Sequence, residues 1–146
     1  MTSPEELAAQ AQCRDVVLRA AEAVDDGDAQ AFAALFAPDG VLVRPDGSHL
    51  QGRMAIAQVY ASRDPDRLTQ HLICNHRVTV DLAVGTAESH CKVLLWSGRR
   101  SAEASAKGRP ADAMQQVGEM HDQLQRDTQG SWFIQKRIAR FVFYSS

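Results

Sequence analysis

Two long strand-like segments in the middle of the chain restrict the fold most strongly. Residues 68–81 read LTQHLICNHRVTVD and residues 85–96 read GTAESHCKVLLW, and both are rich in β-branched and apolar residues. A short turn near Ala83–Val84 joins them, which predicts a long antiparallel hairpin. If the turn takes two residues, His71 lies opposite Trp96 on one face of the hairpin. We therefore expect a sheet organised around this hairpin.

Helices are expected before this hairpin and a second hairpin after it. Ser3 and Pro4 are typical of a helix start, and Gly27 is typical of a helix end, so the first helix closes at Asp25–Asp26. Other expected elements are a short helix at 29–36, a strand at 41–44, a helix at 52–62, and strands at 117–127 and 132–144. This order predicts an α+β fold, with an antiparallel sheet wrapped over three helices.

Residues 97–116 form the longest segment without a clear pattern. Twenty residues is long for a connection within a domain, so a mobile loop, a lid or an extra helical turn all fit. Arg99, Arg100, Lys107 and Arg109 within it are most simply solvated, and recruitment of an acidic substrate is an alternative.

The size and composition of the chain exclude several classes of function. A length of 146 residues predicts a single domain over residues 1–146. A net charge of −2 gives no basic surface for nucleic acid, and no apolar segment is long enough to span a membrane. The start of the chain, MTSPEELAAQ, does not resemble a secretory signal. Three cysteines, an odd number, favour reduced thiols and a cytoplasmic location.

A histidine on the central hairpin and an acid at the end of the first helix are the candidate chemical groups. His71 can act as a general base near neutral pH, and a carboxylate such as Asp25 can fix its tautomer and stabilise the imidazolium. Two simpler interpretations remain open. His71 can be a hydrogen-bonded core histidine, and Asp25 can be an ordinary helix-end residue. Because Asp28 is well placed to cap the second helix, Asp25 is free to face inward.

Several segments together resemble a known family. They are AVDDGDAQAFAALFAPDGVLV, YASRDP, HLICNHRVTVD, GTAESH and GEMHDQLQRDTQGSWFIQKR. They resemble the SnoaL-like branch of the nuclear transport factor 2-like superfamily over nearly the whole chain, roughly residues 7–140. The resemblance implies a cone, in which a strongly curved sheet closes around three helices and leaves an internal pocket.

The resemblance also implies site residues. In the dehydratase and dehydrochlorinase members, an acid ending the first helix orients a histidine on the third strand, and Asp25 and His71 stand at those positions. Arg137 resembles the arginine that the dehydrochlorinase uses on its last strand. It either points into the pocket or pairs with a surface acid such as Asp122.

The sequence also departs from the fungal dehydratase of this superfamily. Val24 replaces a tyrosine, and Trp96 stands where a second histidine is expected opposite His71. His90 is too far along its strand, about 20 Å, to take that place. Residues expected to line the pocket are Phe36, Tyr60, Ile73 and Trp96.

No metal-binding spacing is visible around the histidines. His49, His76 and His90 follow no zinc pattern, and in the expected register His76 lies on the face opposite His71. His121 is expected to have no role. The chemistry implied by the resemblance needs neither metal nor cofactor.

The expected function is a cofactor-independent lyase or isomerase acting on a small, mostly apolar, cyclic molecule. His71 would be the base, Asp25 its orienting carboxylate, and Arg137 a stabiliser of negative charge. The alternative is a non-catalytic ligand-binding or assembly domain, like the β-subunits of ring-hydroxylating dioxygenases. The apolar run Phe141–Tyr144 favours a homodimer or homotrimer, because an exposed apolar strip tends to be covered.

Overall fold

The computed structural model describes residues 1–146 as three helices and six strands. In chain order these are α1 (Pro4–Asp25), α2 (Ala29–Ala34), β1 (Phe36–Val43), β2 (His49–Gln51), α3 (Arg53–Ala61), β3 (Arg67–Asp81), β4 (Thr86–Arg99), β5 (Gln115–Arg126) and β6 (Trp132–Ser145). No helix combines the length and the apolar character that a membrane-spanning segment needs.

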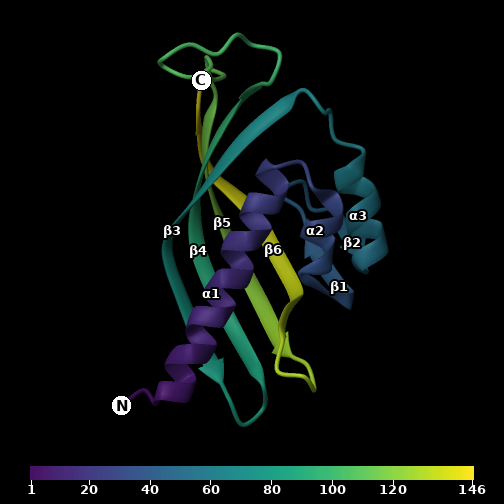
Figure 1. Ribbon diagram of the computed structural model, residues 1–146, viewed down its shortest axis with the longest axis vertical. Helices are drawn as coiled ribbons and strands as arrows, with labels where there is room; N and C mark the ends of the chain where they lie inside the picture. Colours follow the sequence, from purple (N-terminus) through teal and green to yellow (C-terminus); the bar gives the residue numbers. More distant parts are fainter.

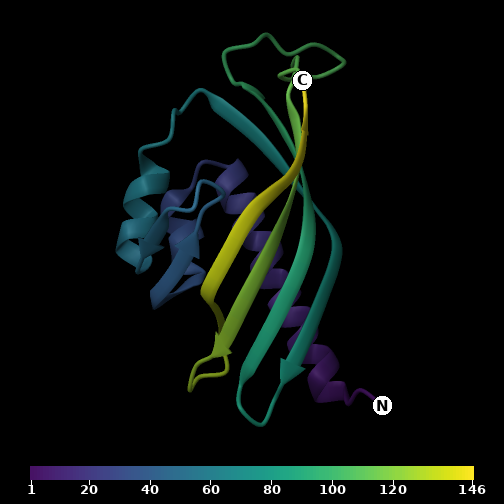
Figure 2. The same ribbon diagram turned by 180° about the vertical axis from the view of Figure 1, so that it is seen from behind.

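The six strands form one curved sheet in the order β2-β1-β6-β5-β4-β3. Neighbouring strands are antiparallel except β1 and β6, which run parallel. All three helices lie on one side of the sheet, with α1 crossing it obliquely and α2 and α3 beside β1 and β2 (Figure 1). No helix covers the other side (Figure 2). The predicted α+β architecture, with a curved sheet over three helices, is confirmed.

The first helix begins and ends as its sequence predicts. The Ser3 hydroxyl accepts a hydrogen bond from the amide of Glu6 at 3.1 Å, and Pro4 opens the helix. At the other end Gly27 adopts a φ of +72°, a left-handed conformation that glycine reaches without strain. Asp28 then caps α2, because its carboxylate accepts a hydrogen bond from the amide of Ala31 at 3.0 Å. Asp25 is therefore the last helical residue, and its side chain is free for other contacts.

The second helix is shorter than predicted, and Phe36 belongs to a strand. α2 ends at Ala34, and the chain pairs at once with the last strand, where Phe36 faces Ile134. The amide of Ile134 donates to the carbonyl of Leu35 at 2.9 Å, which ties this junction to β6. A short apolar run fits either a helix or a strand, and here pairing with the distant strand β6 makes it a strand.

A β-bulge in β3 changes the predicted register of the long hairpin. From Arg77 to Asp81 the pairing is as predicted, but it shifts by one residue between Cys74 and Arg77. At the bulge Asn75 takes a φ of +50°. Asparagine is one of the few non-glycine residues that tolerate this left-handed conformation. Beyond the bulge His71 faces Leu95, whereas the prediction had placed it opposite Trp96. One inserted residue therefore puts the side chains of residues 67–74 on the face opposite to the predicted one.

The core lies between the helices and the concave side of the sheet. Its largest fully buried side chains are Phe32, Phe36, Leu42, Ile56, Leu124 and Ile134. The Phe32 ring meets the Phe36 ring edge-on at 5.2 Å between centroids. The free thiols of Cys13 and Cys91 are buried, and burial raises the pKa of each to about 11. Neither thiol is therefore a nucleophile at neutral pH.

Candidate functional site

Asp25 and His71 are in direct contact where the end of α1 meets the start of β3. The Nδ1 atom of His71 lies 2.6 Å from Oδ1 of Asp25, and the backbone amide of His71 donates to Oδ2 at 2.8 Å. The Thr69 hydroxyl donates to the same carboxylate at 2.9 Å. Thr69 is two residues before His71, so both side chains face the same side of the strand. Three donors therefore hold this carboxylate in one orientation.

Holding a carboxylate at this position has a cost that the hydrogen bonds offset. Asp25 is the last residue of α1, where the helix dipole disfavours negative charge, and the last turn of the helix contains no basic residue. Burial would raise the pKa of Asp25, but the hydrogen bonds from His71 and Thr69 outweigh it and leave the pKa below its ordinary value. Asp25 is thus ionised, and its contact with Nδ1 favours the His71 tautomer that has its proton on Nδ1.

His71 lines a cavity of about 530 Å³ between the helices and the sheet. This volume suits a small molecule. Much of the wall is apolar, formed by Ala20, Val24, Phe32, Leu42, Val93, Leu95, Met120 and Phe141. Tyr60 also lines it, as predicted, and its ring lies 4.5 Å from that of Phe32. None of residues 100–114 contributes to the lining, so the long loop is not a wall of this cavity.

Three of the residues predicted to line the cavity do not line it. Phe36 is fully buried in the core, and Phe32 takes the lining position. Ile73 is on the same side of β3 as His71 but packs in a separate cluster with Val17 and Cys91. Trp96 is 42% exposed, because it follows the inward-facing Leu95 on the regular strand β4 and lies opposite Gln70 on the outer side of the hairpin.

Arg137 both lines the cavity and pairs with Asp122. Its Nε and Nη2 atoms donate to the two carboxylate oxygens at 2.7 and 2.8 Å, a bidentate ion pair. The predicted surface acid is in fact fully buried, since Asp122 is 0% exposed and Arg137 only 4%. Burial would lower the pKa of Arg137, but the Asp122 carboxylate outweighs it and raises the pKa above the ordinary arginine value. Arg137 is therefore a fixed cation with further N–H groups in the cavity wall.

Three more arginines line the cavity without a carboxylate partner. Arg44, Arg63 and Arg67 are all lining residues, and none of them makes an ion pair. Burial and the nearby charge of Arg67 lower the pKa of Arg63, so like charges crowd this side of the cavity. Arg44 lies over the Tyr60 ring, 5.9 Å from its centroid. The sequence does not predict these residues as lining, because isolated arginines in loops and at the ends of helices and strands are usually solvated.

His76 also differs from its predicted placement. The bulge puts it on the same side of β3 as His71, and its Nε2 atom lies 2.7 Å from the Ser89 hydroxyl. Burial, together with the charge of Arg14, lowers the pKa of His76, so the ring is neutral at neutral pH. It is not among the cavity-lining residues, and the Ser89 contact accounts for its position as a structural histidine.

Comparison with known proteins identifies the fold. A Mycobacterium tuberculosis protein of unknown function is similar with a TM-score of 0.77 and 21% identity, covering 97% of this chain and 77% of its own. A hexachlorocyclohexane dehydrochlorinase matches with a TM-score of 0.77 and 15% identity, covering 95% of this chain and 88% of its own. ActVI-ORFA from Streptomyces coelicolor matches with a TM-score of 0.71 and 17% identity, covering 90% of this chain and 95% of its own. At such identities the likeness concerns the fold alone.

The family is set by a direct match to the sequence. No protein of curated function is significantly similar to the chain. The family model for the SnoaL-like domain, however, matches residues 5–138, which is nearly the whole chain. A nuclear transport factor 2-like protein with a cystatin-like fold is also among the similar structures. The chain belongs to the SnoaL-like domain family.

Proposed function

We propose that the protein is a cofactor-independent lyase or isomerase in which His71 removes a proton from carbon. The 2.6 Å contact between Asp25 and Nδ1 of His71, beside a largely apolar cavity, is the observation that carries this proposal. With Nδ1 occupied by the carboxylate, the lone pair on Nε2 is available to a bound substrate. Similar folds that include a dehydrochlorinase support chemistry of this type.

Asp25, His71 and Arg137 then each have a defined part in proton abstraction. Asp25 fixes the tautomer of His71 and stabilises the imidazolium that forms, without itself taking the proton. Negative charge develops on the substrate as the carbon loses its proton, on a carbonyl oxygen or a leaving group. The fixed cation of Arg137 stabilises that charge, because the ion pair with Asp122 holds its guanidinium in place before the reaction.

The lining also defines a substrate class. We expect a small, mostly cyclic molecule, because the wall beside His71 is apolar and the volume is about 530 Å³. The three unpaired arginines, Arg44, Arg63 and Arg67, add a requirement that the sequence did not predict. A carboxylate or similar anionic substituent on the substrate would satisfy them, and charge-assisted hydrogen bonds of this kind contribute about 1.5–3 kcal/mol each.

Proton abstraction can be tested before the natural substrate is known. A panel of small cyclic ketones, each with and without a carboxylate, is incubated with the protein in D₂O, and deuterium uptake next to the carbonyl is followed by NMR. We expect uptake to fall by about 10²–10⁴-fold in His71→Ala. His49→Ala is the matched control, since His49 lies on β2 outside the cavity. Equal uptake by His71→Ala and the parent would refute the base assignment.

Binding of the same panel tests the anionic substituent separately. Carboxylates should bind at least about 10-fold more tightly than the corresponding amides at low salt, and Arg63→Gln should remove that preference. If carboxylate and amide bind equally, the anionic requirement is refuted while the role of His71 stands.

The alternative proposal is a non-catalytic ligand-binding or assembly domain. The observation in its favour is the apolar strip Phe141–Tyr144 on β6, where Phe143 is 70% and Tyr144 is 74% exposed. Such a strip suits contact with another chain, and a homodimer or homotrimer remains our prediction for it. Tight binding of a panel member, with no deuterium uptake above the His71→Ala variant, would favour this alternative.

A further inference from the structure

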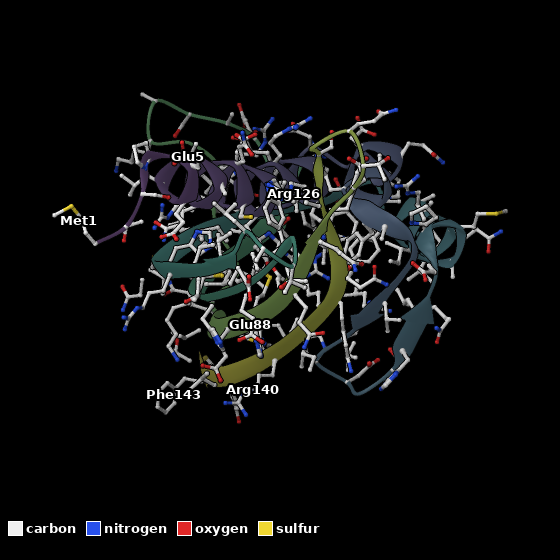
Figure 3. The ribbon with its side chains drawn as sticks, turned by 90° about the horizontal axis from the view of Figure 1, so that it is seen from below. Met1, Glu5, Glu88, Arg126, Arg140 and Phe143 are labelled. Atoms are coloured by element: carbon white, nitrogen blue, oxygen red, sulfur yellow. The ribbon has the colours of Figure 1, made fainter.

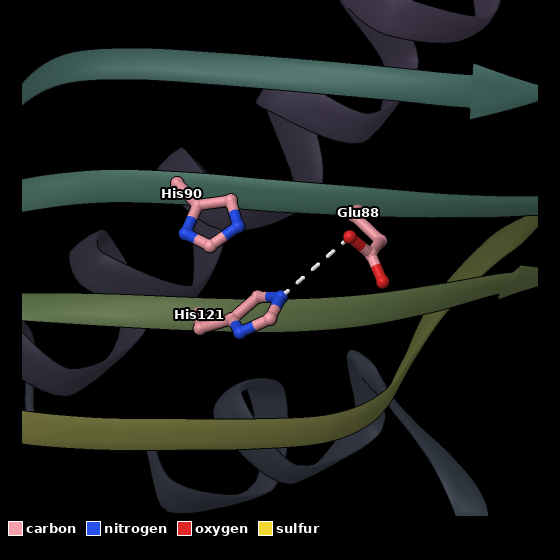
Figure 4. Close-up of side chains that lie close together, drawn as sticks. All are labelled: Glu88, His90 and His121. Carbon is pink, nitrogen blue, oxygen red and sulfur yellow. Dashed lines mark ion pairs between the residues drawn. The ribbon is translucent and has the colours of Figure 1, made fainter.

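Two histidines and a glutamate form a cluster on the side of the sheet that faces away from the helices. Glu88 and His90 extend from β4, and His121 on the neighbouring strand β5 lies directly opposite His90 (Figure 4). The side chain of Glu88 lies on the far side of the sheet from α1 (Figure 3). One donor atom from each residue lies within 4.8 Å of the others. The sequence did not predict this cluster, because the two histidines meet only through strand pairing.

The imidazole of His121 lacks a hydrogen-bond partner within the protein. Its Nε2 atom is buried and unpaired, and the closest acid, Oε2 of Glu88, is 3.9 Å away. That separation is too long for a hydrogen bond, and leaving a buried nitrogen unsatisfied costs about 1–3 kcal/mol. The His90 ring stacks on it, with centroids 3.9 Å apart and an angle of 23°. The orphaned nitrogen thus approaches Glu88 and lies under the His90 ring without bonding to either.

We propose that Glu88, His90 and His121 bind one divalent transition-metal ion of the zinc class. Two imidazole nitrogens with one carboxylate oxygen suit Zn²⁺, Ni²⁺ or Cu²⁺, whereas Mg²⁺ and Ca²⁺ prefer oxygen ligands. Nitrogen ligands lie about 2.1 Å from zinc, which places ligand atoms of a tetrahedral site roughly 3.4 Å apart. The donor atoms must therefore approach one another by up to about 1.4 Å, and the exposed His90 and Glu88 side chains can rotate to supply this movement and to turn the stacked His90 ring toward the ion.

The surrounding charges permit a cation at this position. Lys92, the next outward residue on β4, is already engaged by Glu119, which also pairs with Arg140. Arg77 faces His90 from β3, and Lys136 on β6 faces Gln123, the β5 neighbour of Glu88; neither makes an ion pair. The Arg77 side chain is exposed, so it can extend into solvent when the metal binds. On the other side His121 faces Ile138, which carries no charge.

This site is distinct from the cavity that contains His71. The sheet separates the two, and none of the three residues lines the cavity. The bound ion would leave at least one coordination position for water and would join β4 to β5 by bonds stronger than strand pairing alone. Its expected effect is therefore greater stability of the central hairpins, by linkage to the folded state.

Calorimetric titration of tag-free, chelator-treated protein with Zn²⁺ tests the proposal. We expect one ion per chain at micromolar affinity, with a rise in Tm. His90→Ala and His121→Ala should each weaken binding by at least about 10-fold and abolish the rise in Tm. His49→Ala is the matched control, because it removes another exposed histidine and should leave binding unchanged.

The variants remain interpretable because these side chains make no hydrogen bond within the protein, and circular dichroism checks that each variant folds. Binding that persists unchanged in His90→Ala and His121→Ala would overturn the assignment. Binding that requires millimolar Zn²⁺ would do the same, as would displacement of the ion by millimolar Mg²⁺.

Discussion

Removing Asp122 should destabilise the fold more than any surface substitution, because it leaves Arg137 buried and charged. Asp122 is 0% and Arg137 is 4% exposed, and two hydrogen bonds of 2.7 and 2.8 Å join them. Asp122→Ala breaks both bonds and leaves a guanidinium without a counter-charge. Breaking one side of such a buried pair typically costs about 3–5 kcal/mol. That is a large part of the 5–15 kcal/mol by which a domain is ordinarily stable.

Urea denaturation followed by circular dichroism measures this cost. With an m-value of roughly 2 kcal/mol/M, the midpoint should fall by about 1.5–2.5 M. The matched control is the double variant Asp122→Leu with Arg137→Met, which removes both charges at similar volume. It should recover at least half of the lost stability, because no uncompensated charge remains. A cost below about 1 kcal/mol for Asp122→Ala, as for a surface ion pair, would refute this reasoning.

Further substitutions test the acid, the bulge and the cavity wall. Because the folded pKa of Asp25 is lowered, its contribution is present above the unfolded pKa of about 3.9 and is lost as pH falls through the folded value. The stability advantage of the parent over Asp25→Asn should therefore shrink below about pH 4, and an advantage that does not depend on pH would contradict this. Asn75→Val should cost about 1–2 kcal/mol in urea denaturation, since a β-branched residue resists a φ of +50°, whereas Asn75→Gly should be nearly neutral. Phe32→Ala should cost about 3–5 kcal/mol and Trp96→Ala at most about 1 kcal/mol, and the reverse order would show that the cavity wall has been misassigned.

Much of the fold could be predicted because local signals and pairing agree. Ser3 and Pro4 start a helix, Gly27 ends it, and Asp28 starts another, and each behaves in the structure as those residue types usually do. Phe36 could not be placed correctly, since its local apolar run fits helix or strand and its contact with Ile134 is distant in sequence. The pairing of β1 with β6 therefore decides that Phe36 is in a strand, which the local sequence pattern alone does not decide.

In the candidate site, too, neighbouring residues predict local features correctly, whereas contacts between residues distant in sequence are not predicted. The inward position of Asp25 follows from the capping role of Asp28, but its partner on β3 came from the family resemblance. The prediction that His71 and Trp96 share one face is wrong because nothing in the sequence marks Asn75 as left-handed, and the bulge there turns His71 to the inner side while Trp96 stays on the outer side. Asp122 was taken for a surface acid because an acid in an exposed-looking strand is normally solvated, and only the buried Arg137 beside it explains its burial.

The tautomer of His71 is the most direct test of the proposal that Asp25 prepares a base. Side-chain ¹⁵N NMR spectra at about pH 8, where a histidine is ordinarily neutral, distinguish a protonated ring nitrogen from one with a free lone pair. We expect the proton on Nδ1 and a free lone pair on Nε2 in the parent, and a mixture of tautomers in Asp25→Asn. A parent spectrum with the proton on Nε2 would contradict the account, because the nitrogen facing the cavity could then not accept a proton from a substrate.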